Sequence, residues 1–335
     1  MKNAILFFTF LFVNAYSFSQ IADFKDINFT KADNIAKLHK GSSIKNLPLL
    51  CHNLTYKLNT DAEKFRAIYT WVCNNIKGDN YLHNKVTKKR KKYAKDSIGL
   101  LKWNTTYKKT IFKKLVNKKK TMCTGYAYLI KEMATIVGLD CKIIEGYGRS
   151  VNANIDALEN LNHSWNAVKI NNKWYLCDAT WSSGYMDGKG NFIQEYNNGY
   201  FLTEPTLFAK NHFPKNQKWL LSANTSVKTF TTAPIVYGES FKHKIILEHP
   251  QNLQVITKRK EPLFFKIKSL KNIANKRLSL IFMFGNKEKE FNIYDVHKNK
   301  DSITFKNKFK WKGYYDVHLK VNKDIVATYT IKVTN

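Results

Sequence analysis

Residues 162–181 read NHSWNAVKINNKWYLCDATW, two short runs of β-forming residues separated by Asn171 and Asn172. Asparagine tolerates the positive φ angles of a two-residue hairpin turn, so this stretch predicts a β-hairpin with the two asparagines at its tip. That turn would place His163 opposite Thr180. His163 and Asp178 would then be diagonal neighbours on one face of the sheet, close enough for a hydrogen bond.

The predicted register also sets what surrounds this pair. Trp165 would lie opposite Asp178 and share its face with Trp174 and Leu176, where these side chains would exclude water. A carboxylate beside an imidazole fixes the orientation of the ring. We therefore expect Asp178 to orient His163, with the second ring nitrogen directed at a reacting group.

Cys123 stands earlier in the chain, in the segment TMCTGYA at residues 121–127. Apolar residues recur behind it at helical spacing as far as Gly138, which predicts a helix that starts near the cysteine. A helix start or a neighbouring imidazolium favours the thiolate and brings a thiol pKa from about 8.5 to about 3.5–7.5. Cys123, His163 and Asp178 have the residue types of a nucleophile, its base and an orienting acid in acyl transfer.

Acyl transfer also needs hydrogen-bond donors for the oxyanion that forms on the attacked carbonyl. The backbone amide of Cys123 is the predicted first donor, and Gly125 would let backbone and substrate approach closely. Asn117, Trp103 and Tyr126 are candidates for the second donor, and the sequence favours none of them.

Each of the three residues also has a structural explanation when it is taken alone. Cysteine is commonly a small buried hydrophobic residue, histidine on a strand is commonly half-buried, and aspartate before Ala179-Thr180 commonly caps a turn. Their joint context favours chemistry. No closely spaced cysteine or histidine pairs with ligand spacing occur in the sequence, so neither a metal nor a cofactor is expected.

The first residues predict export. Lys2, an apolar run over residues 5–13 and small residues at Ser17 and Ser19 describe a cleaved secretory signal, assigned to residues 1–19. The run is too short for a stable membrane anchor. We expect the protein to act in the periplasm or outside the cell.

The other cysteines would be Cys51, Cys73, Cys141 and Cys177 if Cys123 is the nucleophile. Four are too few for a disulfide framework, even in an exported protein. Buried thiols are favoured over disulfides for them, because cysteine is among the most buried residue types.

The 335-residue chain carries a formal net charge of +31, a balance typical of proteins that bind nucleic acids or anionic surfaces. Its cations are almost all lysine, whereas proteins that recognise base sequence use the planar guanidinium of arginine. No sequence-specific nucleic-acid binding is therefore expected. The dense runs at residues 88–92 and 118–120 are interpreted as solvated loops, with electrostatic contact to an anionic cell surface as the functional alternative.

The 44% hydrophobic composition supports two domains with sizeable cores. Thr60 and Glu63 form a capping-box pattern ahead of a helical stripe, whereas the lysine-rich residues 85–120 predict short helices or a partly mobile excursion. From residue 233 onward, short β-forming stretches alternate with polar turns, which predicts an immunoglobulin-like β-sandwich. The expected domains are residues 20–232, with an N-terminal helical extension, and the accessory residues 233–335.

Three segments resemble the transglutaminase-like superfamily and, within it, the kyphoscoliosis peptidase branch: MCTGYA at 122–127, HSWNAV at 163–168 and WYLCDATW at 174–181. The segment YFLTEP at 200–205, followed by His212, Pro214 and Trp219, extends the resemblance, which covers residues 62–221. It implies a papain-like α+β core in which a nucleophile helix packs on an antiparallel sheet. It also implies Cys123 as nucleophile, His163 as base and Asp178 as orienter.

Members of that superfamily include protein crosslinkers, peptidases, amidases and inactive proteins, so the resemblance leaves the reaction open. The first hypothesis is an exported thiol enzyme that cleaves or transfers peptide or side-chain amides, with proteins, peptides or peptidoglycan peptides as substrates. Hydrolysis is favoured over crosslinking, because water outcompetes amines unless the site excludes it. The alternative is a catalytically silent protein that uses the same fold to bind partners or organise a surface. No aspartate-rich calcium loop is evident, so calcium control is not expected.

Overall fold

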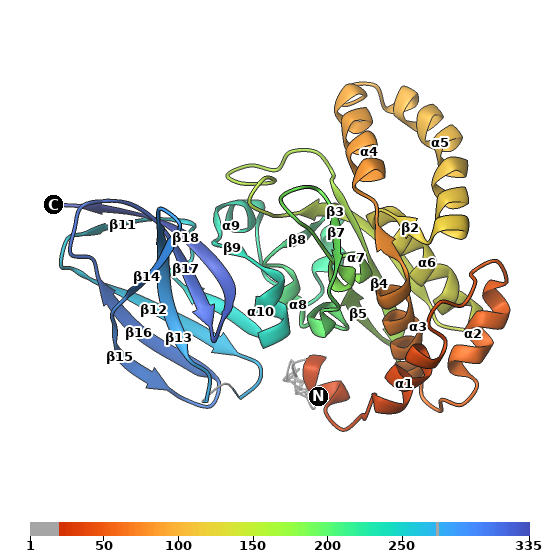
Figure 1. Cartoon of the computed structure of the whole chain (residues 1–335), viewed down its shortest axis with the longest axis horizontal. Coiled ribbons are helices and arrows are strands. Elements are labelled where there is room, and N and C mark those ends of the chain that lie inside the picture. Colours follow the sequence, from red (N-terminus) through yellow and green to blue (C-terminus); the bar gives the residue numbers. More distant parts are fainter. Residues whose placement is uncertain (1–19, 273–274) are drawn as a thin grey trace, which may run out of the picture.

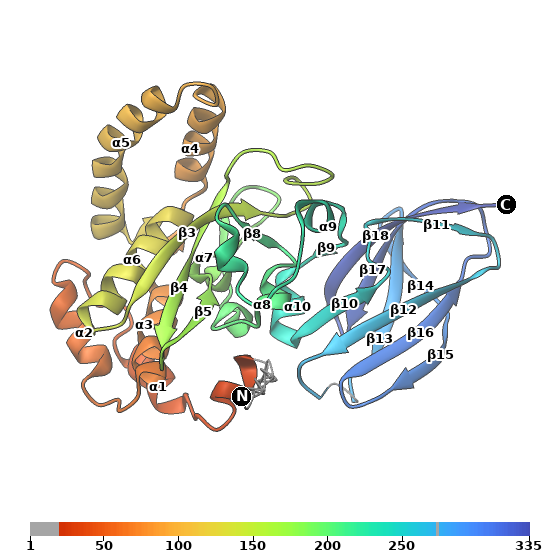
Figure 2. The ribbon, with the colours of Figure 1, turned by 180° about the vertical axis from the view of Figure 1, so that it is seen from behind.

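The computed structural model describes residues 20–272 and 275–335. The predicted secretory signal, residues 1–19, lies outside the described residues. Figures 1 and 2 show a helix-rich N-terminal part beside a C-terminal part built of strands, so the chain is α+β as expected. No helix among the described residues is long and apolar enough to cross a lipid bilayer.

Helices gather on one side of the N-terminal part. They are the 3-10 helix η1 (Gln20–Phe24), α1 (Thr30–Leu38), α2 (Leu47–Thr55), α3 (Asp61–Asn75) and, further along the chain, α6 (Cys123–Ile136). The capping box predicted at the start of α3 is confirmed: Thr60 Oγ1 accepts from the Glu63 amide at 3.2 Å, and the Glu63 carboxylate accepts from the Thr60 amide at 3.0 Å. These bonds satisfy amides that a helix start leaves without partners.

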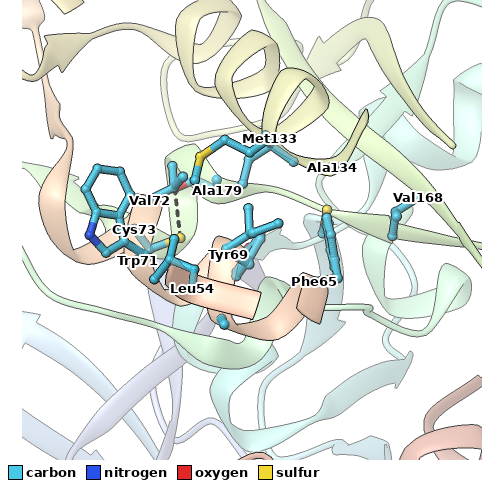
Figure 3. Packing of buried hydrophobic residues seen from close by; sticks show 14 of the residues in the cluster. Leu54, Phe65, Tyr69, Trp71, Val72, Cys73, Met133, Ala134, Val168 and Ala179 are labelled. Atoms are coloured by element: carbon cyan, nitrogen blue, oxygen red, sulfur yellow. Dashed lines mark hydrogen bonds between the residues drawn. The ribbon is translucent and has the colours of Figure 1, made fainter. Parts of the chain in front are cut away.

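The helix that carries Cys123 is held by an apolar core. Figure 3 shows Met133 and Ala134 of α6 beside Tyr69 and Val72 of α3. Val168, further along the chain, belongs to the same apolar cluster. All five side chains are fully buried. Burial of a large apolar side chain stabilises the fold by about 1.5–3 kcal/mol, so this packing fixes the position of α6.

Behind α6 lies a four-stranded antiparallel sheet in the order β5-β4-β3-β8. Its strands are β3 (Cys141–Gly148), β4 (His163–Ile170), β5 (Lys173–Cys177) and β8 (His212–Pro214). The predicted hairpin is confirmed in both turn and register: Asn171 and Asn172 have φ of 50° and 62°, and Ile170 pairs with Lys173. Strand pairing stops at Cys177, so Asp178 and Thr180 are not ladder residues and the predicted pairs His163–Thr180 and Trp165–Asp178 do not form.

The lysine-rich segment before Cys123 is a helical hairpin. The helices α4 (Asn80–Lys92) and α5 (Ser97–Lys118) project from the rest of the molecule in Figure 1. The hairpin is closed at its base by the parallel pair β1 (Lys77–Gly78) and β2 (Lys120–Thr121). The interpretation of residues 88–92 as a solvated loop is wrong, because lysine and arginine have good helix propensity and the run completes α4.

Short elements follow the β4–β5 hairpin. They are α7 (Ala179–Ser183), β6 (Gly184–Met186), β7 (Phe192–Gln194), η2 (Asn198–Tyr200), α8 (Pro205–Phe208), η3 (Gln217–Leu220), α9 (Val227–Thr232), β9 (Ile235–Val236) and α10 (Gly238–His243). The face of the sheet that carries Trp165 and Leu176 packs on α8, away from α6. The sharing of one face by Trp165, Trp174 and Leu176 is therefore confirmed, with all three in or against the same apolar cluster.

The C-terminal part consists of two facing sheets. One has the order β10-β12-β16-β15 and the other β11-β18-β17-β13-β14, with β9 also paired to β18. Their strands are β10 (Ile245–His249), β11 (Gln254–Lys258), β12 (Pro262–Ser269), β13 (Leu278–Phe284), β14 (Lys287–Phe291), β15 (Ile293–Lys298), β16 (Ser302–Lys308), β17 (Gly313–Val321) and β18 (Asp324–Thr334). Phe265 of the first sheet meets Tyr329 of the second at a ring-centroid distance of 5.6 Å. The finer immunoglobulin-like assignment stays a prediction.

A buried arginine lies at the junction of the two parts. The guanidinium of Arg149, just after β3, donates to the carbonyls of Asn154, Thr231, Ala233 and Pro234. Since a buried guanidinium needs partners for its donors, these carbonyls satisfy it and fasten the loop after β3 to the segment that leads into the C-terminal sheets.

Candidate active site

Cys123 is the first residue of α6, and its side chain is 3% exposed. The close approach predicted at Gly125 is present: a Cβ there would lie 1.8 Å from Thr121 Oγ1, at the end of β2. Glycine is therefore required for the first turn of α6 to pack on β2. This contact sets where the thiol stands relative to the base of the α4–α5 hairpin.

His163 begins β4, and its side chain is directed at Asp178. His163 Nε2 donates to Asp178 Oδ2 at 2.8 Å, and both side chains are buried. A hydrogen bond also joins the ring to Cys123. Because Nε2 donates to the Asp178 carboxylate, Nδ1 is the ring nitrogen that is available to the Cys123 sulfur. The fold thus brings all three predicted residues together in one row.

Asp178 combines the two roles that the sequence left as alternatives. It is the N-cap of α7, where its Oδ1 accepts from the Thr180 amide at 2.8 Å, while Oδ2 holds His163. The cap leaves the carboxylate little rotational freedom, because both of its oxygens are hydrogen-bonded. A turn-capping role and an orienting role are therefore compatible in this residue.

A second histidine reaches the same carboxylate. His212, at the start of β8, donates from Nε2 to Asp178 Oδ2 at 3.2 Å, and its Nδ1 hydrogen-bonds with Asn211 at 2.7 Å. The ring is fully buried and stacks on Phe208 at a centroid distance of 3.9 Å. No local pattern predicts this contact, because β8 is three residues long and far along the chain; only the resemblance includes His212.

The charges in this row support one another. Burial raises the pKa of the Cys123 thiol, but the hydrogen bond and charge of His163, aided by Arg90, outweigh it and leave the pKa lowered. Burial would lower the pKa of His163, yet the charge and hydrogen bond of Asp178, with Cys123, raise it to about 10. His163 and His212 hold the pKa of Asp178 well below its usual range despite burial. Together these shifts favour a thiolate–imidazolium pair next to a carboxylate.

Cys123 differs in this respect from the other cysteines, all of which lie in the described residues. Burial raises the pKa of Cys51 and of Cys141 to about 12 and that of Cys73 and Cys177 further. All five are free and buried, so the interpretation of the four as buried thiols is confirmed. Burial alone makes a thiol inert, and the imidazole of His163, aided by Arg90, reverses this at Cys123.

A pocket of about 670 Å³ opens above the pair, with Cys123 and His163 among its lining residues. Trp181 stacks on the His163 ring at a centroid distance of 4.6 Å and lines the same pocket. A Cβ on Gly148 would lie 3.1 Å from both His163 and Trp181, so glycine gives these rings room. The aromatic cover restricts water around the imidazole.

The α4–α5 hairpin forms another wall. Leu82 and Val86 of α4 pack with Met122 and Cys123 in one apolar cluster. Arg90, also on α4, lines the pocket and donates to the Leu161 carbonyl at 2.9 Å. The lysine-rich insertion is therefore part of the site, because it shapes the pocket and places a cation near the thiol.

The predicted oxyanion donors differ in whether they are free to donate and whether they line the pocket. The Cys123 amide is the first of α6, and such amides have no partner within the helix. Tyr126 is unavailable, because its hydroxyl donates to the Ile76 carbonyl at 2.7 Å inside the core. Asn117 and Trp103 are not among the residues that line the pocket. The Thr180 hydroxyl, in contrast, is buried without a hydrogen-bond partner among the described residues, and Thr180 lines the pocket.

One metal-like arrangement occurs within the row itself. Donor atoms of His163, Asp178 and His212 lie within 4.8 Å of one another. Both histidines bond to the same Asp178 oxygen, at 2.8 and 3.2 Å, and this sharing accounts for the spacing. A bound cation would also oppose the protonation of His163 that the carboxylate favours.

Comparisons with known proteins point to one superfamily. A sequence model described as the transglutaminase-like superfamily matches residues 49–179. Kyphoscoliosis peptidase of Mus musculus is 28% identical over 260 residues, 75% of this chain and 34% of the relative. The Homo sapiens protein of that name is 30% identical over 218 residues, 62% of this chain and 29% of the relative. Hillarin of Drosophila melanogaster is 25% identical over 232 residues, 65% of this chain and 26% of the relative.

The chain spans about a third, or less, of the length of these relatives. The shared region nevertheless contains the nucleophile helix, the hairpin and the start of α7. Residues 49–179, which include Cys123, His163 and Asp178, match the transglutaminase-like superfamily, and over a wider range the chain is similar to the kyphoscoliosis peptidases.

Proposed function

We propose that this chain is an exported thiol acyl-transfer enzyme that cleaves or transfers peptide or side-chain amides through a thioester. Cys123 is the nucleophile, His163 the general base and acid, and Asp178 the orienter. The observation that carries the proposal is the lowered pKa of a buried thiol that hydrogen-bonds to a carboxylate-held imidazole. The peptidase name of the relatives is consistent with this reaction.

The geometry suits a two-step reaction. The Cys123 sulfur attacks the amide carbonyl carbon, and the carbonyl electrons move to the oxygen, beside the Cys123 amide. When the C–N bond breaks, the leaving nitrogen takes the proton from His163 Nδ1, which leaves a thioester. Water then gives a proton to His163 and attacks, the C–S bond breaks, and a carboxylic acid and the thiolate are released.

Hydrolysis is the favoured outcome over crosslinking. Hydrolysis needs only water as the second reactant, whereas crosslinking needs an amine bound beside the thioester. Water at its bulk concentration competes with any amine unless the bound substrate excludes it. The proposed substrate class is a protein or peptide, in keeping with the peptidase name of the relatives, and a pocket of about 670 Å³ has room for a few side chains of such a substrate.

Covalent capture tests the proposal. The wild-type chain should form an adduct with members of an electrophilic amide probe library, and Cys123→Ala should form none. Cys141→Ala is the matched control, since it removes a thiol whose pKa is raised. A Cys123→Ala protein that turned over every tested amide as fast as the wild type would refute the proposal, whereas a wild type that forms no adduct and turns over no amide would favour the alternative, a catalytically silent binding protein.

A further inference from the structure

A basic concavity lies on the C-terminal β-sheets, away from the candidate active site. It has a volume of about 670 Å³ and is lined by Arg259, Lys260, Asn292, Tyr294, Lys308, Phe309, Lys310 and Trp311. The turn between β11 and β12, the start of β15 and the end of β16 contribute these residues. Arg259 N donates to the Thr334 carbonyl, which places the concavity near the C-terminus, at the end of the molecule farthest from α4 and α5 (Figure 1).

The charge of this concavity is uncompensated. Four of its lining residues are cations and none is acidic. Among the described residues, none of these four cations takes part in a salt bridge, although fifteen such pairs occur elsewhere. Like charges held together without counterions repel one another, so an anion bound here would stabilise the arrangement.

Two aromatic side chains complete the surface. Trp311 is 72% exposed, so its indole offers an open apolar face on which a ligand can pack. The Tyr294 hydroxyl is buried, and no described residue hydrogen-bonds to it. Lys308 Nζ lies 5.4 Å from the centroid of the Tyr294 ring. A ligand that offers both a flat apolar face and polar oxygens would satisfy these groups together.

We propose that this concavity binds an acidic polysaccharide, with Trp311 against the face of a sugar ring and the four cations paired with its carboxylate, phosphate or sulfate groups. Sugar rings present C–H faces that pack on aromatic rings and hydroxyls that accept from or donate to a phenol. The volume lies within the range of about 300–1,000 Å³ typical of small-ligand sites.

Other anionic partners fit less well. Base-reading proteins rely on arginine, and three of the four cations here are lysine. Strands of nucleic acid occupy long basic grooves with several aromatic platforms, whereas this concavity is bounded by turns and has one exposed indole. An anionic bilayer also attracts clustered lysines, but its surface is flat, whereas these cations line a concavity.

Isothermal titration calorimetry on the full chain at about 0.15 M salt tests the proposal. The probes are polygalacturonate, dextran sulfate, neutral dextran and poly(dT). At least one of the two acidic polysaccharides should bind, and raising the salt should weaken that binding. Trp311→Ala, and separately the double change Lys308→Gln with Lys310→Gln, should weaken it by about tenfold or more.

Matched control variants separate an effect of this concavity from a general loss of exposed aromatic rings or positive charge. Tyr314→Ala removes an aromatic side chain that is 73% exposed but lines another hollow, and Lys300→Gln with Lys323→Gln removes two charges elsewhere. Both should leave affinity within about twofold. Cys123→Ala should bind as the wild type does, since this site is independent of the proposed chemistry. Equal binding of neutral dextran, tighter Trp311-dependent binding of poly(dT), or full affinity in Trp311→Ala would overturn the proposal.

Discussion

His212 Nε2 lies 3.2 Å from Asp178 Oδ2, the same oxygen that accepts the hydrogen bond of His163. The carboxylate is thereby held from two sides as well as by its cap on α7. His212 does not touch the pocket, so it acts on the thiol only through Asp178. We regard it as a positioning residue.

The first prediction concerns this position. His212→Phe should lower kcat by about tenfold to a hundredfold, because a displaced carboxylate misaligns the imidazole. KM should change little, since His212 does not line the pocket. His212→Gln can still donate to Asp178 and should recover most of the loss. Steady-state kinetics on a captured amide substrate checks this; equal activity of the Phe variant would assign His212 to packing alone.

The second prediction concerns acid stability. Burial lowers the pKa of His212 to about 4, so the folded state holds this ring neutral where the unfolded chain, with a usual value of 6.5, takes up a proton. The free energy of unfolding is therefore not reduced by His212 above pH 6.5, and it falls by about 3 kcal/mol in total as the pH drops toward 4. Urea unfolding between pH 7 and 4.5 should show a shallower loss in His212→Gln than in the wild type. Parallel curves would contradict this.

The third prediction is the reactivity of the thiol. Because the pKa of Cys123 is lowered and that of His163 is raised to about 10, a larger share of Cys123 should be thiolate at a given pH than in a free cysteine. Iodoacetamide at pH 6 should label Cys123 at least about tenfold faster than a free cysteine, whose pKa near 8.5 leaves it mostly protonated. Mass spectrometry locates the label. The other four cysteines should stay unlabelled in the folded protein, and a wild type as slow as Cys123→Ala would refute an activated thiol.

The fourth prediction concerns Asp178→Asn. An amide in place of the carboxylate removes the charge that raises the pKa of His163, so the imidazolium is lost at lower pH. We expect kcat to fall by about 10³–10⁴-fold, as removal of the acid does in other triads, and the alkaline limit of the rate profile to move to lower pH. Asp140→Asn, which removes an exposed carboxylate paired with Lys142 at 2.9 Å, is the control and should keep wild-type rates.

The fifth prediction concerns the packing that sets the thiol. Gly125→Ala places a Cβ where Thr121 Oγ1 stands, so it should destabilise the fold by about 1–3 kcal/mol and lower activity. Thr121→Ala deletes that oxygen, which has no hydrogen-bond partner among the described residues, and should partly rescue Gly125→Ala in the double variant. Gly188→Ala, where a Cβ meets nothing within 4 Å, should be neutral. Thermal unfolding and kcat together decide the outcome.

The hairpin of β4 and β5 could be predicted because its determinants are local. Two asparagines fix the turn, alternation fixes the faces, and these place His163 and Asp178 within reach of each other. The helix start at Cys123 and the capping box at Thr60 are likewise determined by a few adjacent residues.

Contacts between distant segments could not be predicted in this way. His212 reaches Asp178 from a three-residue strand, and Arg90 reaches Leu161 from a helix whose charged run resembles a loop. The strands β14 and β15 are also hard to recognise in the sequence, since they are largely exposed and alternation of apolar residues is weak in them. Each depends on tertiary packing that no short pattern encodes.

Arg149 has a mechanical consequence. Its guanidinium donates hydrogen bonds to the carbonyls of Thr231, Ala233 and Pro234 on one side and of Asn154 on the other. Asn152 and Ala153, next to Asn154, line the pocket that contains the thiol. If the N-terminal and C-terminal parts slide relative to each other, either these hydrogen bonds must break or the pocket residues next to Asn154 must move as well.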